Sequence, residues 1–434
     1  MKKQKQHISL APILSVNFVG TLGFSIVLPF LVFLVTRFGG NAFIYGIMGA
    51  TYSVFQLIGA PILGKWSDRY GRRKILLLSQ LGTLASWLIF LLAMALPVSQ
   101  LLEVESGIAG HFVITVPLLV LFFARALDGI TGGNVSVANA YLADITEEAD
   151  RSKNFGKMAV AANVGFIFGP ALAGLLGVTT MGESLPVMAA ALISLIATLI
   201  IFFKLEESQQ CVLTKDPEKP NVRKIMGQEH KECFKIETPA GISIKDVLKL
   251  KHVGFLLTIY FLDYLGFSLF HIAFPVHAVQ ALNWQLTDTG LFFSFMGLTM
   301  VLVEGPVLSR LSRKCSDAWL VLVGSAILAS SFLFFTSGSI WLIYTGAALL
   351  AAGNGLMWAS FLAILSKIAE QKYQGTIQGI ASSCGSLASI LGLVSGGLLY
   401  EKVGQSVFII STIIIFIVVL MALRFYLVQR KAEA

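Results

Sequence analysis

Gly64 to Lys74 reads GKWSDRYGRRK, and this charged stretch separates two long apolar runs, residues 43–63 and 75–96. Each run is about 20 residues long, which is the length that an α-helix needs to cross roughly 30 Å of hydrocarbon. The stretch between the runs is rich in charge, and its glycines permit a tight turn that is not helical. We therefore expect two membrane-spanning helices joined by a short polar loop.

The same alternation of apolar runs and charged loops continues along the whole chain. Of the 434 residues, 56% are hydrophobic and only 13% are charged, whereas soluble domains carry about 25% charged residues. This composition excludes a soluble globular enzyme and predicts an all-α polytopic membrane protein without enzymatic activity. We expect twelve transmembrane helices, at residues 10–36, 43–63, 75–96, 112–143, 155–178, 185–203, 252–279, 288–308, 319–335, 340–368, 375–399 and 407–428.

The positive charges predict the orientation of these helices. Of the 32 Lys and Arg residues, all but Arg37, Arg125 and Lys402 belong to the termini or to one set of alternate loops. Loops rich in Lys and Arg stay on the cytoplasmic side, so we expect both termini in the cytoplasm and the chain in a cell inner membrane. The net charge of +8 follows from this bias and from contact with membrane lipids. No nucleic-acid motif accompanies it.

One long polar segment divides the chain. Residues 205–251 are rich in charge and proline, which predicts a cytoplasmic linker between two six-helix bundles, residues 1–204 and 252–434. Cys211, His230 and Cys233 lie in this segment and are residue types that bind metals. No fourth ligand of matching spacing appears, so we expect free thiols and no metal site.

The two bundles share a repeated pattern. Gly23-Phe-Ser recurs as Gly266-Phe-Ser, and three glycines of the fifth helix recur at one constant offset in the eleventh, where Gly156, Gly169 and Gly174 correspond to Gly379, Gly392 and Gly397. Repeated six-helix units imply a substrate site at the midplane between the halves, which rock between inward-open and outward-open states. Glycines also recur simply because they suit helix packing faces, which is the alternative explanation.

The stretch from Gly64 to Lys74 resembles the loop 2–3 signature of the major facilitator superfamily, G-x-x-x-D-R-x-G-R-R/K. The matching positions are Gly64, Asp68, Arg69, Gly71, Arg72 and Arg73. In that superfamily the loop gates the outward-facing state, so the resemblance implies a gating role here. The corresponding stretch of the second half, residues 305–314, lacks the acid and the second glycine, which leaves Asp68 to carry this role alone. The cluster also acts as topogenic positive charge.

Two further motifs resemble the drug:proton antiporter and tetracycline-efflux branch of the superfamily. Residues 165–174 are similar to the antiporter signature G-x-x-x-G-P-x-x-G-G through Gly165, Gly169, Pro170 and Gly174. Residues 125–146 are similar to the R-x-x-x-G and Y-x-A-D-x-T pattern of helix 4. The resemblance implies proton-coupled export, although small residues four apart also serve plain helix packing. Asn17 stands where that branch commonly has an acid, which argues against tetracycline–metal export.

Four ionisable residues stand out inside the predicted spans, where a charge at mid-bilayer costs about 2.5–3.5 kcal/mol: Arg125, Asp128, Asp263 and Glu304. Arg125 and Asp128 are three residues apart and share a helix face. They form either a permanent ion pair or a switch in which the carboxylate exchanges its arginine for a proton. Asp263 takes the place of Gly20 in the repeat and is the second candidate site for a proton or cation. Glu304 is a further candidate or an interfacial partner of nearby arginines.

Polar and aromatic residues of helices 1, 4, 7 and 10 are the candidates for substrate binding: Asn17, Asn134, Tyr264, His271, Asn354 and Trp358. A cavity with few polar groups among many aromatic rings suits an amphiphilic solute. Each of these residues taken singly is more often a packing residue than a ligand-binding one.

The chain has no phosphate-binding loop of the form G-x-x-x-x-G-K-[ST], so the energy for transport must come from an ion gradient or from the solute itself, and no cofactor is expected. We expect a monomeric secondary active transporter, a proton-coupled antiporter that exports a small amphiphilic molecule or drug by alternating access. One alternative is a proton symporter or uniporter that imports a nutrient or a siderophore-like solute. Another is a non-transporting receptor or scaffold that works through the central linker.

Overall fold

The computed structural model describes residues 9–132, 134–146, 151–177, 179, 181–208, 250, 252–368 and 370–433. Most of the predicted linker, with Cys211, His230 and Cys233, lies outside these residues, and so do the side chains of Asp68 and Asn134. Among the described residues, ten helices are long and apolar enough to cross a membrane. Large apolar side chains such as Leu88, Leu175 and Phe203 are exposed on them, as expected where lipid covers the protein.

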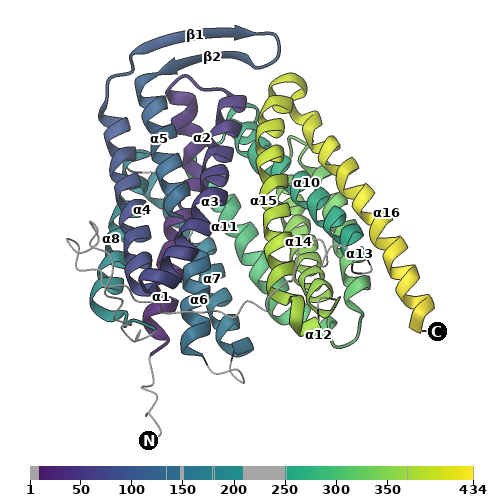
Figure 1. Ribbon diagram of the computed structural model, residues 1–434. Helices are drawn as coiled ribbons and strands as arrows, with labels where there is room; N and C mark the ends of the chain where they lie inside the picture. Colours follow the sequence, from purple (N-terminus) through teal and green to yellow (C-terminus); the bar gives the residue numbers. More distant parts are fainter. Residues whose placement is uncertain are drawn as a thin grey trace, which may run out of the picture.

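The N-terminal half of the chain forms a bundle in which the first and fourth spans each consist of two consecutive helices (Figure 1). Its helices are α1 (Ala11–Ser25), α2 (Val27–Arg37), α3 (Ala42–Tyr70), α4 (Arg72–Ala95), α5 (Val116–Thr131), α6 (Asn134–Ile145), α7 (Arg151–Gly177) and α8 (Ser184–Lys204).

The C-terminal half forms a second bundle beside the first (Figure 1). Its elements are α10 (Val253–Gln280), α11 (Leu286–Leu302), the π-helical turn η3 (Val303–Val307), α12 (Leu308–Leu311), α13 (Asp317–Phe334), α14 (Ile340–Ile368), α15 (Glu370–Val403), the 3₁₀ turn η4 (Gly404–Ser406) and α16 (Val407–Glu433). When α1 with α2, α5 with α6, and α11 with η3 and α12 are each taken as one span, these described helices correspond to the twelve predicted ones.

Prolines and caps explain where several helices break. α1 ends at Ser25, four residues before Pro29, because proline has no N–H to donate to the carbonyl of residue i−4 and its ring clashes there. Pro275 lies inside the unbroken α10, so a proline interrupts one of these two helices and not the other. Pro306 lies in the π-helical turn η3, a common outcome where proline interrupts the regular ladder. At the start of α3, the side-chain oxygen of Asn41 accepts a hydrogen bond from Ile44 N at 3.1 Å.

The structure corrects the expected start of the fourth span. Residue 112 was expected to begin a helix, but it lies in an antiparallel hairpin of β1 (Gln100–Ser106) and β2 (Gly110–Thr115), and the helix begins at Val116. Polar and apolar residues alternate along β1, and β2 ends in β-branched residues, which favour strands. The hairpin lies over the loop between α2 and α3, where Val113 N donates to Gly39 O at 2.8 Å.

Two repeated glycines pack at equivalent places in the two halves. Gly169 of α7 lies against α1 at Ser25, and Gly392 of α15 lies against α10 at Ser268, so that a side chain at either glycine would overlap the neighbouring helix. Ser25 and Ser268 are themselves the last residues of the repeated Gly-Phe-Ser. These equivalent contacts support a duplicated six-helix unit.

The two halves are in close contact at the face that carries the hairpin, which we call the hairpin face. There Gly174 of α7 lies against Gly290 of α11, and Gly397 of α15 lies against Ala42 of α3. Glu401 of α15 reaches across the same face, and its Oε1 accepts a hydrogen bond from Ala42 N at 2.7 Å. α1 begins and α16 ends at the opposite face, the terminal face (Figure 1). These contacts close the hairpin face.

Candidate functional site

Three cavities lie between the two halves and share walls. The aromatic cavity, of about 410 Å³, lies mostly among α10, α11 and α14. The amide cavity, of about 540 Å³, lies mostly among the N-terminal helices α1, α3, α4 and α5. The bridging cavity, of about 260 Å³, is lined from both halves. Tyr264 lines all three, so they form one candidate site at the centre of the molecule.

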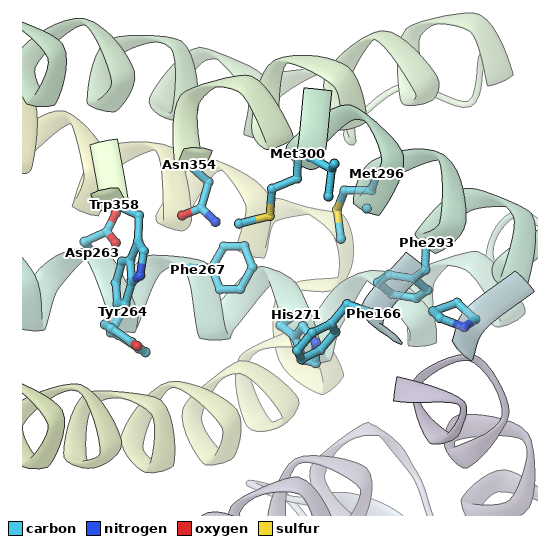
Figure 2. A pocket seen from close by; sticks show the side chains of 13 residues that line it. Phe166, Asp263, Tyr264, Phe267, His271, Phe293, Met296, Met300, Asn354 and Trp358 are labelled. Atoms are coloured by element: carbon cyan, nitrogen blue, oxygen red, sulfur yellow. The ribbon is translucent and has the colours of Figure 1, made fainter. Parts of the chain in front are cut away.

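The aromatic cavity brings together four of the six predicted substrate-binding residues. Figure 2 shows Tyr264 and Trp358 near one end, Asn354 in the middle and His271 toward the other end. The rings of Tyr264 and Trp358 are 4.7 Å apart, in an edge-to-face arrangement. Two thioether side chains complete the wall, those of Met296 and Met300. The cavity therefore offers ring faces and polarizable sulfur to an apolar ligand.

Asp263 supplies the carboxylate of this cavity. It lies one residue before Tyr264, at the same end as Trp358 (Figure 2), and it is 2% exposed. Its Oδ1 is buried without a hydrogen-bond partner among the described residues, and no described ion pair includes it. A carboxylate in such surroundings needs a proton or a cation to compensate its charge, as expected for a site that exchanges the two.

Arg125 and Asp128 form the predicted ion pair, with Arg125 Nη1 3.3 Å from Asp128 Oδ2. Both side chains are buried. The guanidinium also lies over the ring of Tyr52, 4.6 Å from its centre, a favourable arrangement for a cation. The pair is divided between two cavities: Asp128 lines the amide cavity, and Arg125 lines the bridging cavity. A change in either cavity can therefore act on one member of the pair.

The amide cavity holds residues that the sequence analysis missed: Tyr52, Gln56, Gln80, Thr83 and Trp87. The fifth predicted substrate residue, Asn17, also lines this cavity rather than the aromatic one. The signal that could have found the two glutamines is their position, because each is an uncharged amide within an apolar span. Asn134, the sixth, lies outside the described side chains.

Glu304 is not brought to the central cavities, since it lines none of the three. It belongs to η3, and its Cγ lies 3.2 Å from where a side chain at Gly355 of α14 would begin. The π-helical turn adds a residue to the helical turn and so changes the direction of the side chains around it. Glu304 therefore packs between α11 and α14, and Gly355 makes that approach possible.

The motif at residues 64–74 forms a compact network at the terminal face. Gly71 adopts a φ of 101°, which glycine tolerates best, and ends α3 before α4 begins. Arg72 Nε lies 3.0 Å from Asp144 Oδ2, and Arg72 N donates to Glu207 Oε1 at 2.7 Å. The guanidinium of Arg73 donates to the carbonyl oxygen of Phe202. Glu207, a further residue that the sequence analysis missed, thus caps α4 from the segment after α8.

Other motif residues lie at the edge of this network or away from it. The guanidinium of Arg69 lies 5.6 Å from the centre of the Tyr70 ring, and no atom lies within 4 Å of where a side chain at Gly64 would begin.

Of the four cysteines, Cys315 and Cys384 are described and free.

The antiporter-like glycines occupy helix contacts. Gly165 and Gly169 of α7 lie against the backbone of α1, and Gly174 lies against α11. Of the four matching positions, Pro170 is the one that lines the aromatic cavity. The motif therefore joins α7 to both halves, which agrees with the packing interpretation and also places α7 at their interface.

Comparison with known proteins shows extended similarity. A sequence model of the family described as Major Facilitator Superfamily matches residues 13–252 and 256–434. The chain is 26% identical over 399 residues to the tetracycline resistance protein, class D, of Salmonella ordonez, covering 91% of this chain and 90% of that protein. It is 26% identical over 409 residues to multidrug resistance protein 2 of Bacillus subtilis (strain 168), covering 92% and 91%. A solved D-xylose-proton symporter shares the fold, with a TM-score of 0.72 at 14% identity over 95% of this chain and 96% of that chain.

Proposed function

The chain belongs to the Major Facilitator Superfamily, and we propose that it is a proton-coupled antiporter that exports a small amphiphilic molecule by alternating access. The observation that carries this proposal is the pair of buried acids at the central cavities. Asp128 is held by Arg125 at 3.3 Å, whereas Asp263 has no described cationic partner. The similarity to tetracycline and multidrug resistance proteins supports export.

The orientation of the exchange follows from the basic residues. Those of residues 64–74 and 310–314 lie at the terminal face, and we propose that this face is cytoplasmic, in a bacterial inner membrane. The hairpin face is then external. The contact between Glu401 and Ala42 at the hairpin face supports a state in which substrate is loaded from the cytoplasm.

The two halves act as two units that rock around the central cavities. Residues 1–204 and 252–434 are the proposed units, and residues 205–251 join them. The substrate binds at the central cavities in the state open to the cytoplasm, while Asp263 is deprotonated. After the hairpin face opens, Asp263 takes up a proton as the substrate leaves, and Asp128 takes up a proton as its separation from Arg125 changes. The next turn of the cycle releases these protons to the cytoplasm.

The test uses inside-out vesicles that carry the full-length protein and an imposed proton gradient, read with a pH-sensitive dye. Lipophilic cations and other amphiphilic compounds are added one at a time. We expect some of them to collapse the gradient, and we expect this collapse to be lost in Asp128→Asn and in Asp263→Asn. The matched control is Asp317→Asn, because Asp317 is an acid that pairs with Lys367 outside the cavities.

Two outcomes contradict the proposal. If compounds collapse the gradient equally in wild type and in both acid variants, the buried acids do not couple protons. If no compound collapses the gradient while labelled solutes still equilibrate across the membrane, the protein is a facilitator or an importer, and the Arg125–Asp128 pair is structural.

A further inference from the structure

The amide cavity contains three side-chain amides whose orientation is fixed by the protein. Asn17 Nδ2 donates to the carbonyl oxygen of Met158 at 2.8 Å. Gln56 Nε2 donates to the carbonyl oxygen of Gly132 at 3.2 Å. Gln80 Nε2 likewise donates to a backbone carbonyl oxygen, that of Ser194, at 3.5 Å. A carbonyl oxygen can only accept a hydrogen bond, so in each amide the nitrogen must point to the backbone.

The amide oxygens are consequently left for a ligand. Oε1 of Gln80 is buried without a hydrogen-bond partner among the described residues, in a side chain that is 1% exposed. The oxygens of Asn17 and Gln56 likewise accept no hydrogen bond from the described part of the chain. A buried acceptor without a donor costs free energy, so an empty cavity of this kind is unfavourable and an occupant with donors is favoured.

Asp128 is the charged residue among the described residues that line the amide cavity. It is held by Arg125 at 3.3 Å, and Arg125 itself lines the neighbouring bridging cavity. The surface that an occupant meets therefore combines three amide oxygens with a carboxylate. A quaternary ammonium ion has positive charge but no N–H group, whereas a primary ammonium has three donors and an amidinium has four. The second kind of cation matches both the charge and the hydrogen-bonding of the cavity.

We propose that the amide cavity is a subsite for the head group of the substrate, and that this head group is a cation with several N–H donors, such as a primary ammonium or an amidinium. The inference rests on the proposed transport function and adds the substrate class to it. The apolar remainder of the same molecule lies in the aromatic cavity, which meets the amide cavity at Tyr264 and Phe166.

The test compares two ligands that share an apolar tail and a charge, phenylbutylammonium and phenylbutyltrimethylammonium. Their dissociation constants are measured with the full-length protein in lipid nanodiscs, by isothermal titration calorimetry. We expect the primary ammonium to bind at least about tenfold more tightly, the factor that corresponds to one hydrogen bond to a charged group. Gln80→Met removes one acceptor at nearly constant volume and should lower this ratio several-fold, and Asn17→Leu should do the same.

The matched control lies in the aromatic cavity. Trp358→Leu should weaken both ligands by a similar factor and leave their ratio unchanged, because both carry the same tail. The proposal is overturned if the ratio in wild type is near one, which would mean that the amide cavity holds only water. It is also overturned if the ratio is large but unchanged in both Gln80→Met and Asn17→Leu, since the preference would then reflect the size of the head group.

The gradient assay separates this inference from the proposed function. If either ligand collapses the proton gradient through Asp128 while the binding ratio is near one, antiport stands and the subsite is wrong. If the ratio is large but neither ligand collapses the gradient in vesicles, the subsite stands and proton-coupled export of such cations is wrong.

Discussion

Removing one partner of the buried Arg125–Asp128 pair should destabilise the protein more than removing both. Asp128→Asn leaves a buried guanidinium over the ring of Tyr52 without its counter-ion, and Arg125→Met leaves a carboxylate without its counter-ion. Arg125 Nε already has no hydrogen-bond partner among the described residues, so few groups remain to compensate the charge. The double variant removes both charges and leaves neither stranded.

The geometry sets the size of this effect. The charged atoms are 3.3 Å apart and the side chains are 6% and 7% exposed, so Coulomb's law with an effective dielectric constant of about 20 gives an attraction of about 5 kcal/mol. Breaking a buried pair from one side costs about 3–5 kcal/mol. The double variant should therefore be more stable than the sum of the two single effects predicts, by about 2–3 kcal/mol.

The assay is a double-mutant cycle on the free energy of unfolding, measured by denaturant titration of the purified variants in detergent micelles. The chain offers a matched control in Arg37 and Glu183, which are also 3.3 Å apart but have side chains that are 52% and 26% exposed. Arg37→Met and Glu183→Gln should show a coupling energy below about 1 kcal/mol, because solvent screens an exposed pair.

The same variants of the central pair should all lose compound-driven proton movement in vesicles, including the double variant. The free energy of unfolding and the proton movement driven by the compound are thus measured on one set of proteins. The reasoning is refuted if the destabilisation of the double variant equals the sum of the single ones, or if the coupling energy of the exposed control pair is as large. A double variant that transports normally would show that the pair holds α5 in place and takes no part in proton exchange.

Three further predictions follow from individual contacts. Tyr52→Leu should reduce proton-coupled transport by roughly 2- to 30-fold, because it removes about 0.5–2 kcal/mol of cation–π stabilisation from Arg125. Tyr52→Phe should retain most activity, and equal losses in the two variants would contradict this. Glu401→Met removes the acceptor for Ala42 N and should loosen the hairpin face. Leu393→Cys in that background should react several-fold faster with a membrane-impermeant maleimide than in the wild-type background; unchanged labelling would show that Glu401 does not hold the face closed. Gly169→Val should prevent normal assembly, because a side chain at this position overlaps α1. Gly64→Ala should be tolerated, because no atom lies within 4 Å of where its side chain would begin. Size-exclusion chromatography of the purified variants measures both outcomes.

The membrane spans could be predicted from the sequence because hydrophobic length alone determines whether a helix can cross a bilayer. The hairpin at residues 100–115 could not, since its strands are short and the apolar residues of β2 extend the apolar run of the following helix. The interruption at Ser25 was also missed. A proline in a membrane helix breaks the helix at one place and leaves it continuous at another, as Pro29 and Pro275 demonstrate.

The site was only partly predictable for a different physical reason. The spacing of Arg125 and Asp128 predicted their contact, because residues three apart share a helix face. The cavity that each of them lines depends on helix rotation and on neighbouring helices, which spacing does not determine. Gln56 and Gln80 were missed because a single amide in an apolar span looks the same whether it bonds to backbone or faces a cavity. The position of Glu304 beside Gly355 could not be predicted either, because the π-helical turn that contains it has no simple sequence signature.

The duplication explains how one fold came to hold two chemically different cavities. Gly20 and Asp263 are equivalent in the repeat, and both line a central cavity. The next residues, Thr21 and Tyr264, are equivalent as well, and Thr21 lines the amide cavity. The backbone thus presents the same positions to the centre from both halves, and the side chains alone make one cavity hydrogen-bonding and the other aromatic. Because the carboxylate of Asp263 has no counterpart at Gly20, the acid of the amide cavity comes instead from α5, where Arg125 can control it.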